Sequence, residues 1–299
     1  MGQALVRHFL ESQVSVVAYN RTGSKTEEFF EEYKERIGKG EKLAEFIPVF
    51  DYRDFVSELE RPRIIFIMVE HGHAVDEVID NLIISGCGKD DIVTDCGNSY
   101  YKDSIMRYKR LKENGIKFLD AGVSGGIEGA RDGACIMVGG ERQVFDQVKP
   151  YFEELTGEKG DVTYFGESGA GHYVKMVHNG VEYGMMQAIS EGFEILHKSL
   201  YKPDLHKVAL NWRKGSVIRG WLMELLERAL SKDQNLSQIE GVIGGGSTGE
   251  WTVEAAKELL IEVPVIEKSV EMRKKSKEKP TFAGKVAAAL RREFGGHPV

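Results

Sequence analysis

The sequence contains few cysteines, few prolines and no long hydrophobic run. Its three cysteines, Cys87, Cys96 and Cys135, are widely spaced and form no CxxC pair, which argues against a disulfide framework or a cysteine-rich metal site. The eight histidines form no HExxH pattern, so we predict that no metal is bound. No apolar stretch is long enough to span a membrane and no signal peptide is evident. These features together predict a cytoplasmic protein with reduced thiols.

Positive charge is also in deficit. The chain has 40 lysines and arginines against 47 aspartates and glutamates, a formal net charge of −7. Such a protein is a poor general binder of nucleic acid, and we expect neither nucleic acid nor membrane as a partner. A bound anion would need its own local cluster of positive groups. The one marked basic run, Arg273–Lys279, precedes Pro280, and we expect it to form a solvated loop.

Strand and helix patterns alternate over the first part of the chain. Short apolar runs, often ending in polar or glycine-rich residues, predict strands within Val14–Asn20, Arg63–Val69, Asp91–Cys96, 117–126, Ala134–Gly140 and 162–166. This alternation predicts an α/β, Rossmann-like parallel sheet. After Gly166 helical periodicity dominates. We therefore predict a dinucleotide-binding domain over residues 1–166 and an all-α domain over residues 167–299 that binds substrate and forms oligomers.

The start of the chain resembles the middle of a βαβ unit. A helix begins at once and leads into the strand Val14–Asn20, so the first strand and most of the glycine turn are expected to be missing. In a dinucleotide fold, Gly2 would be the last glycine of a GxGxxG turn. Asn20, Arg21 and Thr22 would then lie where the adenosine ribose is recognised, and an arginine there favours NADP over NAD. Taken alone, these three residues also fit a solvated turn.

Two further strand ends carry candidate ligand-binding residues. Asn98 follows one strand, and Ser124, Gly125 and Gly126 follow the next. Ligands of open parallel sheets bind at the carboxyl ends of the strands, which makes these residues candidates. Taken alone, each is more typical of a turn that binds nothing.

The stretch Gly169–Gly184 carries the strongest signal. On a helix, Lys175, Asn179 and Glu182 are spaced i, i+4 and i+7, and therefore share one face. We interpret Lys175 and Glu182 as an acid/base pair lining a pocket. The alternative is a partly buried helix with a satisfied polar stripe.

Further along the chain, three features stand out. Arg219 lies in a mostly apolar segment, Gly244–Thr252 is a glycine-rich loop that opens a helix, and the chain ends with Arg291 and His297 around a Phe-Gly-Gly turn. An arginine clamp and the backbone N–H groups of a helix start both suit a phosphate. For the first two features, a surface arginine and a structural turn are the alternatives.

Several of these motifs together resemble one family. KMVHNGVEYGMMQ, DCGNS, GVSGG and the terminal FGGHPV are similar to the short form of the decarboxylating 6-phosphogluconate dehydrogenases. The resemblance implies oxidation and decarboxylation of 6-phospho-D-gluconate to ribulose 5-phosphate, with reduction of NADP or NAD, in the pentose phosphate pathway. It also implies a homodimer or homotetramer in which the C-terminal tail is exchanged between subunits.

The same resemblance assigns residue roles. Lys175 would be the general base on the C3 hydroxyl, and Glu182 would deliver a proton to C1 of the enediol. The implied substrate-binding residues are Asn98, Ser124, Gly125, Gly126, His178, Asn179, Tyr183, Arg219, Arg291 and His297. The implied cofactor-binding residues are Gly2, Asn20, Arg21, Thr22, Val69 and Asn98.

Two alternatives remain at this stage. One is a related β-hydroxyacid dehydrogenase acting on an acid such as 3-hydroxyisobutyrate, since that family shares a GVSGG-like loop and a catalytic lysine. The other is a catalytically impaired scaffold with a dinucleotide fold, suggested by the missing first strand.

Overall fold

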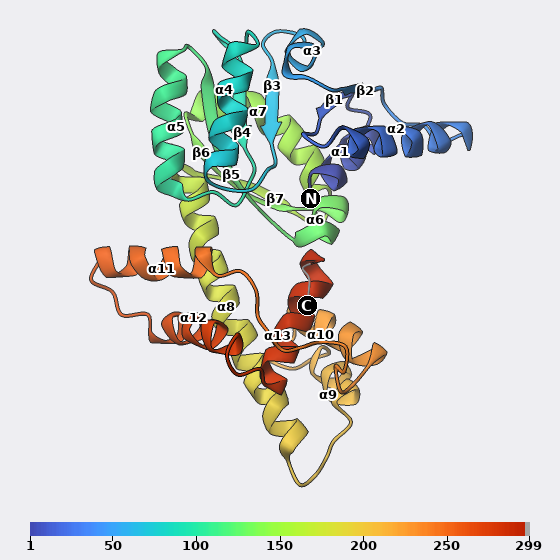
Figure 1. Cartoon of the computed structure of the whole chain (residues 1–299), viewed down its shortest axis with the longest axis vertical. Coiled ribbons are helices and arrows are strands. Elements are labelled where there is room, and N and C mark those ends of the chain that lie inside the picture. Colours follow the sequence, from blue (N-terminus) through green and yellow to red (C-terminus); the bar gives the residue numbers. More distant parts are fainter. Residues whose placement is uncertain (297–299) are drawn as a thin grey trace. The chain divides into compact units, whose positions relative to one another are not determined.

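A computed structural model of the chain describes residues 1–296 (Figure 1). They divide after Lys175 into two compact units, and each unit is described separately below. The predicted domain division at residues 166 and 167 stays a prediction.

The first unit is built on two sheets. Its strands are β1 (Val16–Tyr19), β2 (Phe46–Val49), β3 (Ile64–Ile67), β4 (Ile92–Asp95), β5 (Lys117–Ser124), β6 (Cys135–Gly140) and β7 (Asp161–Gly166). Strands β1 and β2 form a parallel pair, while β3 to β7 form a five-stranded sheet in chain order. All neighbours in the larger sheet are parallel except β5 and β6. The predicted Rossmann-like sheet is therefore confirmed, with one antiparallel pair added.

Helices pack on both faces of the larger sheet. The helices of this unit are α1 (Gly2–Glu11), α2 (Gly23–Gly38), α3 (Tyr52–Ser57), α4 (His73–Ile84), α5 (Tyr101–Glu113), α6 (Gly126–Asp132) and α7 (Arg142–Thr156). Successive residues of a strand point to opposite faces. Accordingly, Ile92 of β4 joins the core formed with α1 and α7, and the next residue, Val93, joins the core formed with α4 and α5. Both faces of β4 are buried, which explains its continuous apolar run.

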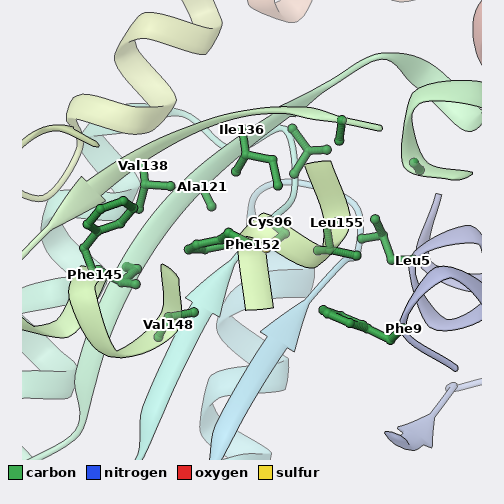
Figure 2. Packing of buried hydrophobic residues seen from close by; sticks show 14 of the residues in the cluster. Leu5, Phe9, Cys96, Ala121, Ile136, Val138, Phe145, Val148, Phe152 and Leu155 are labelled. Carbon is green, nitrogen blue, oxygen red and sulfur yellow. The ribbon is translucent and has the colours of Figure 1, made fainter. Parts of the chain in front are cut away.

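The core that contains Ile92 is rich in aromatic side chains. Phe145 and Phe152 of α7 lie among Ile136 and Val138 of β6, and Phe9 of α1 belongs to the same cluster (Figure 2). Phe9 and Phe152 each pack against the ring of Phe66, with centroids 5.6 Å apart in both pairs. This core holds the N-terminal helix against the larger sheet.

After β7 the described residues are helical. A long helix, α8 (Ala170–Lys198), is followed by α9 (Leu205–Trp212), α10 (Trp221–Lys232), α11 (Ser247–Glu258), α12 (Pro264–Ser276) and α13 (Phe282–Gly295). Phe193 of α8, Leu226 and Leu230 of α10, and Val286 and Leu290 of α13 are fully buried together. The prediction of an all-α part after the sheet is confirmed. In the described chain, 1–296, no helix is long and apolar enough to cross a membrane.

The predicted solvated loop at Arg273–Lys279 is wrong. Helix α12 continues to Ser276, and the side chain of Arg273 is only 6% exposed. Arg273 lies three residues after Val270 and three before Ser276, and all three residues are buried. The i, i+3 spacing therefore places Arg273 on the inner face of an amphipathic helix, while Lys274 and Lys275 remain on its outer face.

Candidate active site

Helix α8 carries the predicted acid/base residues. It is continuous through Lys175, Asn179 and Glu182, so their i, i+4 and i+7 spacing puts them on one face, as predicted. The rise of a helix separates the Lys175 and Glu182 backbones by about 10 Å along its axis. Beside them, His178 Nδ1 lies 3.0 Å from Asn179 Oδ1 and 3.9 Å from Glu182 Oε2.

The N-terminal end of α8 is held by Asp120 of β5. The fully buried Asp120 carboxylate accepts hydrogen bonds from the backbone N–H groups of Gly169, at 2.6 Å, and His172, at 2.9 Å. These groups are among the helix-start donors that have no partner inside a helix. A carboxylate here also interacts favourably with the helix dipole. Asp120 therefore fixes where α8 begins, one and a half turns before Lys175.

Glycines allow α8 to approach the sheet closely. A Cβ atom on Gly171 would lie 2.5 Å from the Asp120 carbonyl oxygen, and one on Gly122 would lie 2.3 Å from Lys175 Cβ. Real Cβ atoms do not make contacts this short, so only glycine fits at both positions. The stem of Lys175 consequently lies directly against β5, two residues before Ser124.

The loop after β5 has the backbone shape that its glycines allow. Gly125 and Gly126 have φ of +120° and +62°, and a Cβ on Gly125 would come within 2.8 Å of Gly129 Cα. Positive φ is readily reached only by glycine. The loop opens α6, and its place next to the Lys175 stem, which rests on Gly122 of the same strand, supports Ser124, Gly125 and Gly126 as binding residues.

Asn98 is exposed on a loop that hydrogen bonds to a buried carboxylate hold in place. The buried Asp95 carboxylate accepts hydrogen bonds from the Gly97 N–H at 3.0 Å and the Ser99 hydroxyl at 2.7 Å. Arg107 of α5 donates to the same carboxylate at 3.3 Å. Asp95 and Arg107 were not singled out in the sequence, because only the folded chain brings α5 under this loop.

The predicted cofactor residues occupy strand ends and turns of the first unit. A Cβ on Gly2 would contact Met68 at 3.6 Å, which places the start of α1 beside the end of β3. Val69 follows in the chain, and its carbonyl oxygen lies 3.1 Å from a Cβ built on Gly97, next to Asn98. Gly2, Val69 and Asn98 therefore gather at the carboxyl ends of β3 and β4.

The turn after β1 is closed by a hydrogen bond between a side chain and the backbone. Asn20 Oδ1 accepts a hydrogen bond from the Thr22 N–H at 2.9 Å, and Arg21 between them is exposed. Helix α2 begins immediately afterwards. This turn could hold the adenosine end of a dinucleotide, with Arg21 accessible to a 2′-phosphate.

In the second unit, the buried Arg273 contacts Tyr183, and a second buried arginine, Arg291, lies near it. The Arg273 guanidinium stacks 3.6 Å from the centre of the Tyr183 ring. The Tyr183 hydroxyl lies 3.2 Å from the Thr248 hydroxyl. The Arg291 guanidinium lies beside Gly244 and Gly245. Burial lowers the pKa of both arginines, and the charge of Arg273 lowers the pKa of Arg291 further.

The other predicted phosphate residues are placed differently. Arg219 is exposed and donates a hydrogen bond to the Ser216 carbonyl oxygen at 3.2 Å. No contact in residues 1–296 joins it to Tyr183 or Arg291. His297 lies outside the described residues. Sequence reasoning missed Arg273, because its neighbours in the chain are exposed lysines.

The three cysteines differ in reactivity. Cys87 and Cys96 are buried and Cys135 is exposed. Burial raises the pKa of the Cys87 thiol to about 12 and raises that of Cys96 as well. Burial also raises the pKa of Cys135, although the nearby positive charge of Lys175 opposes the change.

The fold and these residues define a class of protein: a dehydrogenase with a dinucleotide-binding sheet followed by a helical part. Solved structures with low sequence identity share this fold, among them a 3-hydroxyisobutyrate dehydrogenase from Salmonella typhimurium, with a TM-score of 0.74, 16% identity and 95% of both chains covered. The profile for the NAD binding domain of 6-phosphogluconate dehydrogenase matches residues 1–166. The profile for the C-terminal domain of 6-phosphogluconate dehydrogenase matches residues 171–292. The chain belongs to the 6-phosphogluconate dehydrogenase family.

Individual relatives agree with this membership. Bacillus subtilis YqeC, provisionally assigned as a 6-phosphogluconate dehydrogenase, is 51% identical over 82% of both chains. The NAD-dependent decarboxylating enzyme of Haloferax volcanii is 42% identical over 84% of this chain and 83% of its own. A solved structure of the Plasmodium falciparum enzyme has a TM-score of 0.83 and 35% identity, and covers 93% of this chain. This chain spans 60% of the Plasmodium chain.

Proposed function

We propose that this protein catalyses the oxidative decarboxylation of 6-phosphogluconate to ribulose 5-phosphate with reduction of NADP or NAD. The observation that carries the proposal is the placement of Lys175 and Glu182 on one face of α8, with the start of that helix fixed by Asp120. Relatives with this named activity include both NAD- and NADP-dependent enzymes. Residues 1–166 would bind the dinucleotide, and residues 167–299 would bind substrate and form oligomers.

The residues present fit a dinucleotide. The exposed Arg21 lies within the turn that the Asn20–Thr22 hydrogen bond closes, and Gly2, Val69 and Asn98 gather at neighbouring strand ends. When bound, the nicotinamide supplies the acceptor for the hydride that leaves C3 of the substrate. Arg21 favours NADP, because a guanidinium pairs well with a 2′-phosphate.

Lys175 accepts the proton of the C3 hydroxyl in this mechanism. A lysine must be neutral to act as a base, and proximity to a reacting hydroxyl then makes proton transfer efficient. The protonated Lys175 next donates a hydrogen bond to the new C3 carbonyl. That carbonyl can accept the electrons released when the C1–C2 bond breaks and C1 leaves as CO2, which yields an enediol whose C1 is the former C2 of the substrate.

Glu182 completes the reaction by protonating C1 of the enediol. A proton donor at neutral pH needs a carboxyl group that keeps its proton, as an enclosed site favours. Because both groups belong to one helix, their separation is constant. Asn98, the loop Ser124–Gly126, His178 and Asn179 are assigned to the carboxylate and hydroxyls, and Tyr183, Arg219, Arg291 and His297 to the phosphate.

A substrate comparison tests the proposal. The purified protein should reduce NADP or NAD with 6-phosphogluconate and release one CO2 for each cofactor reduced. With 3-hydroxyisobutyrate the rate should be far lower. Faster turnover of 3-hydroxyisobutyrate would assign the protein to the related β-hydroxyacid dehydrogenases, and no turnover of either acid with either cofactor would favour a non-catalytic scaffold.

A further inference from the structure

Arg107 of α5 occupies a core position of its helix. The buried residues of α5 are Ser104, Arg107 and Leu111, at i, i+3 and i+7, and Leu111 belongs to the apolar core that α4 and α5 form with the larger sheet. The Arg107 side chain is only 3% exposed. Burial lowers its pKa, but the hydrogen bond to Asp76 and the charge of Asp95 outweigh burial and raise it. A charged group therefore lies where the helix pattern favours an apolar one.

Hydrogen bonds connect this guanidinium to two separate segments. Arg107 Nε and Nη2 donate to the Asp76 carboxylate at 2.8 and 3.2 Å, and Nη2 also donates to the Gly72 carbonyl oxygen at 2.9 Å. Arg107 Nη1 donates to the Asp95 carboxylate at 3.3 Å. Gly72 is the N-cap residue of α4 and Asp76 lies in its first turn, whereas Asp95 ends β4. Arg107 thus links the segments that follow two neighbouring strands, β3 and β4.

Both segments carry proposed cofactor-binding residues. Val69 follows β3 and Asn98 follows β4. The segments approach closely, since a Cβ built on Gly97 would lie 3.1 Å from the Val69 carbonyl oxygen and 3.1 Å from Asp95 Oδ1. The Gly97 N–H also donates to Asp95. The position of Val69 relative to Asn98 therefore depends on a network in which Arg107 bonds to both segments.

Stability alone does not account for an arginine at this position. Burial of charged groups costs free energy, and well-packed apolar residues in their place are often equally stable or more stable. A lysine would supply the same charge from a single point. The planar fork of arginine instead directs separate donors to Asp76, Gly72 and Asp95 at once. The arrangement is suited to fixing geometry.

We propose that Arg107 is a positioning residue that holds the segments carrying Val69 and Asn98 in the arrangement that binds the dinucleotide. The inference rests on the proposed function and extends its cofactor site. Segments that are already in the bound arrangement lose less conformational freedom when a ligand binds. Hydride transfer also requires a narrow range of distances between the reacting atoms. Arg107 acts through Gly72 and Asp95 and does not itself contact the cofactor.

Dinucleotide binding without turnover is the first test. The Kd for NADPH and for NADH, measured by fluorescence titration without any sugar acid, should rise about tenfold in Arg107→Met. The matched control is Arg110→Met. Arg110 also lies on α5 and pairs with Asp80 of α4, but both of its ends lie within the helices. This variant should bind both dinucleotides as the wild type does.

Kinetics separate positioning from a purely structural role. In Arg107→Met the KM for the cofactor should rise with the Kd, and kcat should fall about 100-fold for a displacement of about 1 Å. A purely structural role would lower Tm and reduce kcat only in proportion to the folded fraction, with Kd and cofactor KM unchanged. Arg107→Lys should restore only part of the affinity, because lysine keeps the charge and loses the fork.

The outcomes also separate this inference from the proposed reaction. Wild-type Kd and cofactor KM in folded Arg107→Met overturn the positioning role, as does an equal rise of Kd in Arg110→Met or a wild-type protein that binds neither dinucleotide. Should Arg107→Met not fold, Arg107→Lys decides: a raised Kd supports the role, and a wild-type Kd overturns it. A raised Kd in the Arg107 variants of a protein that does not oxidise 6-phosphogluconate supports the role and refutes the reaction.

Discussion

Lys175 rests on Gly122 so closely that no other residue fits beneath it. A Cβ on Gly122 would lie 2.3 Å from Lys175 Cβ and 2.7 Å from its Cγ. The strand therefore determines the position of the lysine stem, and Asp120, two residues earlier on the same strand, determines where the helix begins. One short segment of β5 thus positions the proposed base in two ways, through the lysine stem and through the start of its helix.

Gly122→Ala should impair catalysis by displacing Lys175. Overpacking of this kind costs about 1–3 kcal/mol of stability, and a displacement of about 1 Å lowers kcat about 100-fold. The control is Gly192→Ala on α8, the helix that carries Lys175, where an added Cβ meets no atom within 4 Å. That variant should be stabilised slightly, by about 0.5–1 kcal/mol. Wild-type kcat in Gly122→Ala would show that the close approach does not position the base.

Lys175→Met should abolish turnover while the protein stays folded. The methionine keeps most of the buried stem and removes the amine, so the loss is that of a general base, about 10²–10⁴-fold in kcat. Steady-state rates and circular dichroism measure the two effects. The control is Lys198→Met at the other end of α8, where the amine is exposed and pairs with Glu194 at 2.5 Å. Substantial turnover in Lys175→Met would remove Lys175 from its role.

Glu182→Gln should slow the protonation of the enediol. Because glutamine cannot deliver a proton, kcat should fall about 100-fold or more, with little change in stability. Glu191→Gln is the matched variant, since Glu191 lies on the same helix, is exposed and accepts a hydrogen bond from Gln187. The proposed proton donor would be wrong if both variants kept the wild-type kcat.

Arg21→Asp should shift the cofactor preference from NADP towards NAD. An aspartate repels the 2′-phosphate of NADP and accepts a hydrogen bond from the 2′-hydroxyl of NAD. The measurement is the ratio of kcat/KM for the two cofactors, which should change at least about tenfold towards NAD. Lys25→Asp, a nearby exposed charge change in α2, should leave the ratio unaltered. An unchanged ratio in Arg21→Asp would reject Arg21 as the discriminating residue.

Asp91→Asn should destabilise the first unit in a pH-dependent way. The buried Asp91 carboxylate pairs with Arg63 at 3.0 Å and accepts from the Gly88 N–H at 2.9 Å. Burial raises the Asp91 pKa, but these hydrogen bonds and the Arg63 charge outweigh it, so the folded-state pKa is lowered. The ion pair therefore stabilises the fold above the unfolded-state pKa, near 4, and the stabilisation is lost as the pH falls through the lower folded-state pKa.

Denaturant unfolding at several pH values measures this effect. The difference between wild type and Asp91→Asn should be about 3 kcal/mol from pH 5 to pH 8 and should shrink below about pH 4. Asp90→Asn is the control, because the Asp90 side chain is 61% exposed and lies 3.8 Å from Lys117; exposed pairs contribute about 0–1 kcal/mol. A difference that does not vary with pH would contradict the assigned ion pair.

Much of the fold follows from local patterns. Strand β4 is apolar on both faces, so its run of hydrophobic residues is visible without any tertiary information. Strand β2 cannot be recognised from its sequence in the same way, because it contains Pro48, which lacks the backbone N–H that pairs strands in a sheet. The polar face of α8 is equally readable, since i, i+4 and i+7 positions depend on the helix alone.

Other parts of the site depend on contacts between distant segments. In the sequence, Arg273 is one member of a charged run. Its burial and its contact with the ring of Tyr183, ninety residues earlier, arise only in the folded chain. In the sequence, Asp120 and Gly122 are ordinary strand residues. Their contacts with α8 are formed only in the folded chain. The local sequence gives the chemistry of each side chain. The burial of a charge and the close approach of two backbone segments are properties of the folded chain.

The exposure of the cysteines allows a fluorescent dye to be attached at a single position. Two of the thiols, Cys87 and Cys96, are buried, and Cys135 is exposed. Cys135 pairs with Ser124 across β5 and β6, and its thiol senses the charge of Lys175. A maleimide dye added to the unmodified protein would therefore attach at one place, and its fluorescence would report on occupancy around the proposed base without any engineered residue.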